Sequence, residues 1–295
     1  MSKSKFYGLP AAALLILLPN NSFAQINGEL DEIIVTGSPL SHSVSNSITG
    51  VSVLTGEELA ERLANNIGET LKHEPGVSST FFGAGASRPI IRGQDGDRVR
   101  ILDNGIGSID ASSTSPDHAV AVEPAQAERI EVIRGASVLR FGSSGAGGIV
   151  NVIDGRIPTV VPEDGFDGDL RVGGSTADNG FEFAGALDGG LGENLAVHID
   201  GTFKDTDDFD IPEFAFSDAQ TEALLAEGVP LEEATGAEGQ QPNSAVRIWS
   251  ASGGVSWIDD WGFLGVSVRQ FESTYGITEG AEEGEEEGEE GEEGE

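Results

Sequence analysis

Alternation of apolar and polar residues in the second half of the chain is the feature that most constrains the fold. Successive side chains of a β-strand point to opposite faces of a sheet. In "NLAVHIDGTFKD" (194–205), one face would carry Leu195, Val197, Ile199 and Phe203, and the other Ala196, His198, Asp200, Thr202 and Lys204. The segment therefore predicts a strand with one apolar and one polar side. A soluble β-sandwich gives this pattern, and so does a transmembrane barrel with an aqueous lumen.

Five segments of this kind follow one another, rich in glycine and separated by turns. They lie at about 168–176, 180–190, 194–205, 245–257 and 262–275. "DDW" (259–261) predicts a tight turn, whereas residues 206–244 form a long acidic connection. Short turns that alternate with long loops are typical of outer-membrane barrels. Trp249, Trp257 and Trp261 fit either an aromatic girdle or the packing of a core.

The first residues have the three parts of a secretory signal. Lys3 and Lys5 give a positive start, and the apolar run 11–18 is shorter than the roughly 20 residues that span a bilayer. "SFA" (22–24) is a small-residue cleavage site, which predicts a signal peptide over residues 1–24 and export from the cytoplasm. The chain has no cysteine, which fits an exported protein that does not rely on disulfides.

Charge narrows the range of partners. The net charge of −35 repels phosphate backbones, so we expect no nucleic acid partner. The same charge attracts cations. The last 17 residues (279–295) contain 11 glutamates and no basic residue, which predicts a solvated low-complexity loop.

Residues 31–155 predict a mixed α/β domain. Thr55 is expected to be the N-cap of the first of two short helices, and Pro75–Gly76 is expected to end the second helix. The sequence "DNG" (103–105) predicts the turn of a β-hairpin. The expected strands are 50–55, 88–93, 98–110, 128–135 and 147–154, and the expected helices lie within 56–76 and 136–142.

Several motifs of this domain together resemble the plug of a TonB-dependent outer-membrane receptor. In order, they are "DEIIVTG", "RPIIRG", "RILDNG", "ERIEVIRG" and "VLRFGSSGAGGIVNVI". The resemblance implies an α/β plug domain (25–155) followed by the first strands (156–295) of a large antiparallel β-barrel of about 22 strands in outer-membrane lipid. "DEIIVTG" resembles the TonB box. That likeness implies that Asp31, Glu32, Ile33, Ile34, Val35 and Thr36 bind a TonB-type energy-coupling protein in the periplasm.

Length suggests how much of such a receptor is present. Strands of about 10 residues each would use roughly 220 residues in a 22-stranded barrel, whereas 140 residues follow Gly155. We therefore expect the chain to be truncated within its barrel. Only residues 25–30 precede the TonB-box motif, which favours plain transport over transcriptional signalling.

The stretch 88–124, which includes "SPDHA" (115–119), resembles the plug of the zinc-uptake branch of this family. The resemblance implies that Asp117 and His118 are metal ligands and that barrel residues supply the others. Zn²⁺ accepts imidazole nitrogen and carboxylate oxygen, usually from four ligands. From the residues alone, a solvated loop histidine is an equal alternative.

The other candidate residues have simpler interpretations. His42 and His73 are expected at the surface. His198 faces the polar side of its strand, either as a relay ligand or as an ordinary lumen residue. Three acidic residues have two equal interpretations, either as groups near the metal site that a metal ion contacts on its way or as turn residues: Asp95, Asp97 and Asp110. The glutamate-rich end fits a collector of divalent cations or a solubilising loop.

The sequence thus predicts an active outer-membrane transporter that imports Zn²⁺ as cargo and holds no tightly bound cofactor. The alternative cargo is haem or a metal–siderophore complex. A non-transporting surface binding protein is a rival of another class, but it would not need a coupling segment. Enzyme chemistry is not indicated, because the chain has no cysteine nucleophile and no HExxH motif, and "GSSGAGG" is not a P-loop.

Overall fold

The computed structural model describes residues 50–142 and 144–278. The signal peptide, the TonB-box motif (31–36), His42 and the acidic segment 279–295 lie outside the described residues. We use "plug" for residues 50–155 and "wall sheet" for strands β8, β9, β10, β13 and β14. No helix within the described ranges is long and apolar enough to cross a membrane.

The plug is built on a five-stranded sheet in the order β1-β6-β7-β4-β5. Strands β4 and β7 are parallel, and the other neighbours are antiparallel. β2 and β3 form a separate pair. The elements are β1 (Val51–Thr55), α1 (Gly56–Arg62), α2 (Ile67–Leu71), β2 (Val77–Ser79), β3 (Pro89–Ile91), η2 (Gly96–Arg98), β4 (Val99–Asp103), β5 (Ile106–Gly107), η3 (Ala111–Ser113), η4 (Pro124–Gln126), β6 (Ala127–Ile133), η5 (Gly135–Phe141) and β7 (Gly148–Asp154).

An apolar core closes the plug, because alternate residues of β6 and β7 meet the buried sides of α1 and α2. Ile130, Val132 and Val150 are fully buried there, and Leu59 and Leu71 pack on them from the helices. The predicted hairpin turn is confirmed, since Asn104 and Gly105 both have positive φ angles of 49° and 81°. Such a turn matches the twist of the strands that it joins.

Two of the three helix predictions for the plug are confirmed. Thr55 is the N-cap residue of α1, although its hydroxyl donates to the Glu128 carbonyl at 3.0 Å and not to the helix, because β1 lies beside β6. The predicted short helix at 136–142 is the 3₁₀ helix η5. The predicted end of the second helix was wrong, since α2 ends at Leu71, before Pro75–Gly76.

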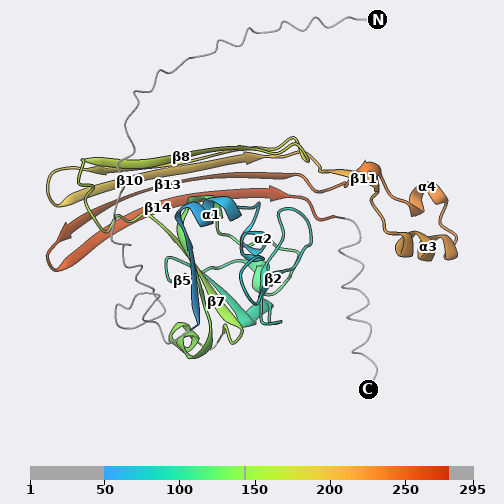
Figure 1. Cartoon of the computed structure of the whole chain (residues 1–295), viewed down its shortest axis with the longest axis horizontal. Coiled ribbons are helices and arrows are strands. Elements are labelled where there is room, and N and C mark those ends of the chain that lie inside the picture. The colour runs from blue at the N-terminus through green and yellow to red at the C-terminus, as the bar shows by residue number, and fades with distance from the viewer. Residues whose placement is uncertain (1–49, 143, 279–295) are drawn as a thin grey trace, which may run out of the picture. The chain divides into compact units, whose positions relative to one another are not determined.

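The wall sheet is a meander in which each strand pairs antiparallel with the next one present in the sheet, in the order β14-β13-β10-β9-β8. Figure 1 shows these strands side by side, with α3 and α4 beyond one of their ends. The predicted alternating segments are all strands of this sheet. Their bounds are β8 (Phe166–Gly174), β9 (Phe181–Gly190), β10 (Leu195–Asp205), β13 (Val246–Asp259) and β14 (Gly262–Tyr275).

The two faces of the wall sheet differ as the alternation predicted. One face exposes Phe166, Leu170, Val172, Phe181, Phe183, Leu187, Ile199, Phe203, Trp249, Val255, Trp257, Leu264, Val266 and Val268. The other face carries polar side chains toward the plug. Trp249 and Trp257 stand on the apolar face and Trp261 is exposed in the turn, so the core-packing alternative for these residues is wrong.

The long connection between β10 and β13 has structure that the sequence analysis did not predict. It contains β11 (Asp210–Phe214), α3 (Asp218–Ala226), α4 (Leu231–Ala234) and β12 (Glu238–Gln240). The start and the end of this connection are joined by Asp208, whose carboxylate accepts hydrogen bonds from the backbone N–H groups of Ser244 and Ala245 at 2.8 and 2.9 Å. In outer-membrane barrels, long loops mark the extracellular end of the strands and short turns the periplasmic end. By this rule, the end of the wall sheet that carries the long connection is called its extracellular end below.

Candidate functional site

Asp117 and His118 lie together on the plug loop that follows η3. Asp117 accepts from the Ser115 hydroxyl, and His118 Nδ1 lies 2.8 Å from Asp117 Oδ1. The hydrogen bonds from Ser115 and from His118 lower the pKa of the Asp117 carboxyl. An ionised carboxylate only accepts hydrogen bonds, so Nδ1 must carry the hydrogen in this contact.

This geometry gives the two residues different chemical roles. With its hydrogen on Nδ1, a neutral His118 presents Nε2 as a lone-pair donor, and its side chain is 49% exposed. Asp117 then orients the ring, as carboxylates behind metal-bound histidines do. Within the described ranges no three His, Asp or Glu side chains gather to hold a metal ion. The described residues at this place therefore offer one free imidazole nitrogen and the carboxylate that orients its ring.

Tyr275 fastens this loop to the extracellular end of the wall sheet. Its hydroxyl accepts from the Ala119 N–H at 2.9 Å, and Tyr275 is the last residue of β14. The close approach requires a small residue on the neighbouring plug loop, since a Cβ on Gly85 would lie 2.4 Å from the Tyr275 Cβ. His118 is thus held at the end of the wall sheet that carries the long connection between β10 and β13.

The remaining histidines and acids have local explanations. His73 is exposed, as predicted. Asp95 and Asp110 are the N-cap residues of η2 and η3, and Asp110 also accepts from the Ala121 N–H at 3.1 Å. Asp97 lies within the single turn of η2. The turn-residue interpretation accounts for their positions.

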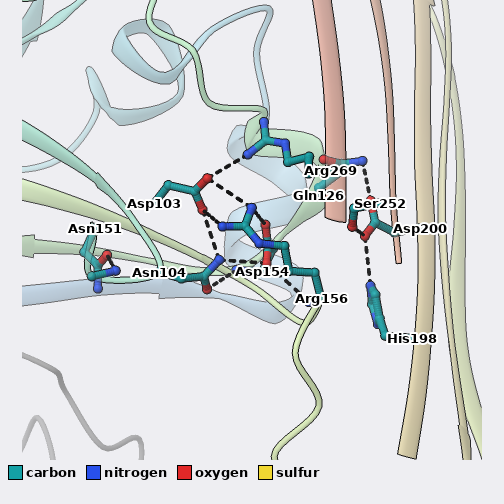
Figure 2. A network of polar contacts seen from close by, with 11 residues as sticks. Asp103, Asn104, Gln126, Asn151, Asp154, Arg156, His198, Asp200, Ser252 and Arg269 are labelled. Atoms are coloured by element: carbon teal, nitrogen blue, oxygen red, sulfur yellow. Dashed lines mark hydrogen bonds and ion pairs between the residues drawn. The ribbon is translucent and has the colours of Figure 1, made fainter. Parts of the chain in front are cut away.

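A polar cluster around Asp103 joins the plug to the wall sheet (Figure 2). Asp103 ends β4, and its carboxylate lies 3.0 Å from Nη1 of Arg269 on β14. It also pairs with Arg156 at 2.9 Å, and Arg156 reaches Asp154 at 3.1 Å. Asn104 donates to Asp154 at 2.8 Å. One carboxylate of the plug is therefore shared between Arg156, the first residue after the plug, and Arg269 of the wall sheet.

Asp200 of β10 is the centre of a second cluster, and Figure 2 shows it beside the first. It accepts from Gln126 of the plug and from Ser252 of β13. His198 lies between two carboxylates, with Nε2 2.9 Å from Asp200 and Nδ1 2.9 Å from Asp188. Both ring nitrogens are thus engaged, so His198 serves this polar contact and offers no free nitrogen to a metal.

Helix η4 of the plug contacts the wall sheet at two places. Its C-terminal residue Gln126 reaches Asp200, and the Ala125 carbonyl accepts from Arg171 of β8 at 2.9 Å. Its N-cap Glu123 is buried and accepts from the Ala125 N–H at 3.0 Å. Burial raises the pKa of Glu123 to about 7.

Sequence reasoning missed the residues of this junction. The alternation places Asp188, Asp200 and Arg269 on the polar face of their strands, and that signal marks them as candidates. It does not reveal their partners, because Asp103 and Gln126 lie in distant parts of the chain.

Comparison with known proteins identifies the class. Residues 43–149 match the TonB-dependent receptor plug domain. The chain is 31% identical over 192 residues to the vitamin B12 transporter BtuB of Photobacterium profundum, covering 63% of this chain and 30% of that protein. It is 30% identical over 195 residues to the ferric enterobactin receptor PirA of Pseudomonas aeruginosa, covering 55% and 24%.

A solved structure agrees with these relatives. The ferric enterobactin receptor of P. aeruginosa in complex with enterobactin aligns with a TM-score of 0.55 and 25% identity, over 77% of this chain and 34% of that one. The chain thus spans about a quarter to a third of the length of the proteins it matches. Residues 43–149 are thus a TonB-dependent receptor plug domain. A plug that contacts the polar face of an antiparallel, outwardly apolar sheet makes the described part of the chain similar to TonB-dependent receptors in sequence and in fold.

Proposed function

We propose that this protein is an energised outer-membrane importer, in which a TonB-type protein pulls on the segment 31–36 and loosens the plug. The observation that carries the proposal is the polar junction between plug and wall sheet. Asp103–Arg269 and Gln126–Asp200 are directional contacts between hydrophilic surfaces. Such contacts can be exchanged for water at a small net cost, whereas an apolar interface cannot. The junction therefore suits a plug that must move and return.

The cargo that fits best is a metal complex of the corrinoid or siderophore class. The vitamin B12 transporter and the ferric enterobactin receptors among the relatives support this class by their names. Charge then favours a neutral or cationic member of it. The described connection 206–245 contains ten aspartates and glutamates and no lysine, arginine or histidine. A field of that sign repels an anionic chelate such as a ferric catecholate and leaves a neutral corrinoid unhindered.

Bare Zn²⁺ is the second candidate cargo, and one observation favours it. His118 presents Nε2 at the extracellular end of the plug, and Asp117 orients the ring through its contact with Nδ1. Imidazole nitrogen is a strong zinc ligand. Further ligands would have to come from residues outside the described ranges.

Uptake by cells that produce this protein tests both the machinery and the cargo. We expect radiolabelled cobalamin to enter only in energised cells, and Ile34→Pro to abolish entry while surface binding survives. Proline removes a backbone donor from a segment expected to pair as an added strand with its partner. Uptake that continues unchanged in Ile34→Pro would contradict the coupling role. Preferential entry of a ferric catecholate would contradict the charge argument.

Zinc titration by calorimetry tests the second candidate. If Zn²⁺ is the cargo, His118→Ala removes a ligand and lowers the affinity strongly, while replacement of His73, which is also an exposed plug histidine, by alanine leaves it unchanged. Asp117→Asn should weaken binding by about tenfold to a hundredfold, the usual effect of losing an orienting group. Equal affinities for wild type and His118→Ala would remove the case for zinc.

A further inference from the structure

Arg88 is a buried cation without a partner among the described residues. Arg88 is 4% exposed. Its side chain makes no hydrogen bond or ion pair with a residue of the described ranges 50–142 and 144–278. The backbone on either side is fixed, since Arg88 N–H donates to the Thr80 hydroxyl and the Arg88 carbonyl accepts from Thr80 N–H, both at 2.9 Å. The guanidinium is thus held in place by a rigid backbone and not by a counter-charge.

Arg88 lines a pocket of about 210 Å³, and all of the other lining residues also belong to the plug. Its polar lining includes Arg100 and the hydroxyl-bearing residues Ser108, Ser112 and Ser113. Arg100 donates one Nη to the Phe141 carbonyl at 2.6 Å, which fixes a second guanidinium at the pocket wall. The pocket is large enough for several water molecules, each of which occupies about 30 Å³, or for a small polyatomic ion.

The two acids on the pocket wall do not neutralise Arg88 directly. Asp110 accepts from the Ser108 and Ser112 hydroxyls and from the Ser112 and Ala121 N–H groups, which engages both of its oxygens. Burial raises the pKa of Asp110, but these hydrogen bonds outweigh it and leave the pKa below its usual value. Asp97 is exposed to solvent. Both lower the electrostatic cost of Arg88 from a distance without filling its donors.

A guanidinium stays protonated at any physiological pH, so its donors need acceptors when it is buried. Burial lowers the pKa of Arg88, while Asp95, Asp110 and Asp97 raise it by their charge. The planar fork of N–H groups matches the two oxygens of a carboxylate or phosphate. We propose that the Arg88 pocket binds a small oxyanion within the plug, held by the Arg88 guanidinium and by the hydroxyls of Ser113 and Ser144, the lining serines that do not donate to Asp110. This inference is independent of which cargo the protein carries.

Titration of the full chain in detergent with inorganic phosphate, and separately with acetate, tests the site. We expect saturable binding by calorimetry and a rise in the temperature at which plug amide protection is lost. Arg88→Gln should weaken binding by at least about tenfold, since it removes a charge-assisted bidentate contact. Phosphate as the better ligand would indicate a free inorganic ion, and acetate would indicate a carboxylate group of a larger molecule.

The matched control is Arg98→Gln, because Arg98 is an exposed arginine of the same region that bonds to Gln94 at 2.9 Å and does not line the pocket. It should bind as wild type does. In anion-free buffer Arg88→Gln should be no less stable than wild type, since it removes an uncompensated buried charge. The inference is overturned if sodium chloride at equal ionic strength has the same effect, if neither anion binds, or if Arg88→Gln binds with unchanged affinity.

Discussion

The interior of the plug and its junction with the wall sheet are held together by opposite means. In the interior, Ile130, Val132 and Val150 are fully removed from solvent and belong to one cluster of buried apolar side chains. At the junction, Asp103 and Asp200 meet arginine, glutamine, serine and histidine. Apolar burial is lost only when the domain opens, whereas each polar contact can be replaced by water. If the plug moves as proposed, this difference would let it stay folded while its contacts with the wall sheet change.

The largest expected effect comes from the interior. Ile130→Ala should destabilise the plug by about 2–5 kcal/mol, because it leaves a cavity in a closed core. All three tryptophans belong to the wall sheet or its turn, so their fluorescence reports the wall, while hydrogen exchange of β6 and β7 reports the plug. We expect lost protection in the plug with little change in fluorescence. Ile106→Ala, at a residue 73% exposed, is the control. Similar effects of both changes would show that the core is not closed.

Glu123 should make the junction sensitive to pH. Its pKa is raised from 4.5 to about 7, so the stability given by its protonated form is fully present below pH 4.5 and is lost as pH rises to about 7. At 1.36 kcal/mol per pKa unit the change is at most roughly 3 kcal/mol. Exchange of the η4 amides should accelerate over this range in wild type and not in Glu123→Gln. An identical pH profile in both proteins would exclude Glu123 as the cause.

The smallest expected effect is that of Arg269→Ala. It removes one partner of Asp103 but leaves Arg156 in place, so we expect a loss of about 1–3 kcal/mol at the junction. Limited proteolysis should cut the plug faster, while the exchange of β6 and β7 stays unchanged. Arg247→Ala is the control, since Arg247 pairs with Asp205 in an exposed position. Loss of protection throughout the plug core would mean that interior and junction are not separable.

Much of this division could be predicted from the sequence, because it depends on local periodicity. The alternation of apolar and polar residues along β10 assigned each of its side chains to one face of the sheet. The pair Asn104–Gly105 identified a turn that needs positive φ angles. The helix α3 was missed although Ser217 caps it by accepting from Gln220 N–H. Its apolar residues, which include Leu224 and Leu225, do not form a stripe along one face, and no residue of the helix is buried.

The partners across the junction could not be predicted, because they depend on register and on distant segments. His198 faces Asp188 only because β9 and β10 pair in one particular register. The burial of Glu123 and Arg88 depends on what packs around η4 and β3, and neither residue has a sequence pattern that distinguishes it from an exposed charge. The orienting role of Asp117 likewise required the position of Ser115 and of the imidazole ring.

The strand order of the two sheets also has a kinetic consequence. Each strand of the wall sheet pairs with its next neighbour in the meander, so its hairpins can form while the rest of the chain is still extended. In the plug, β1 pairs with β6, and Val51 meets Ile133 across most of the domain. Contacts between residues so far apart in sequence form slowly, because a long loop must close first. We therefore expect the wall strands to pair early. In the plug, we expect β1 to pair with β6 late.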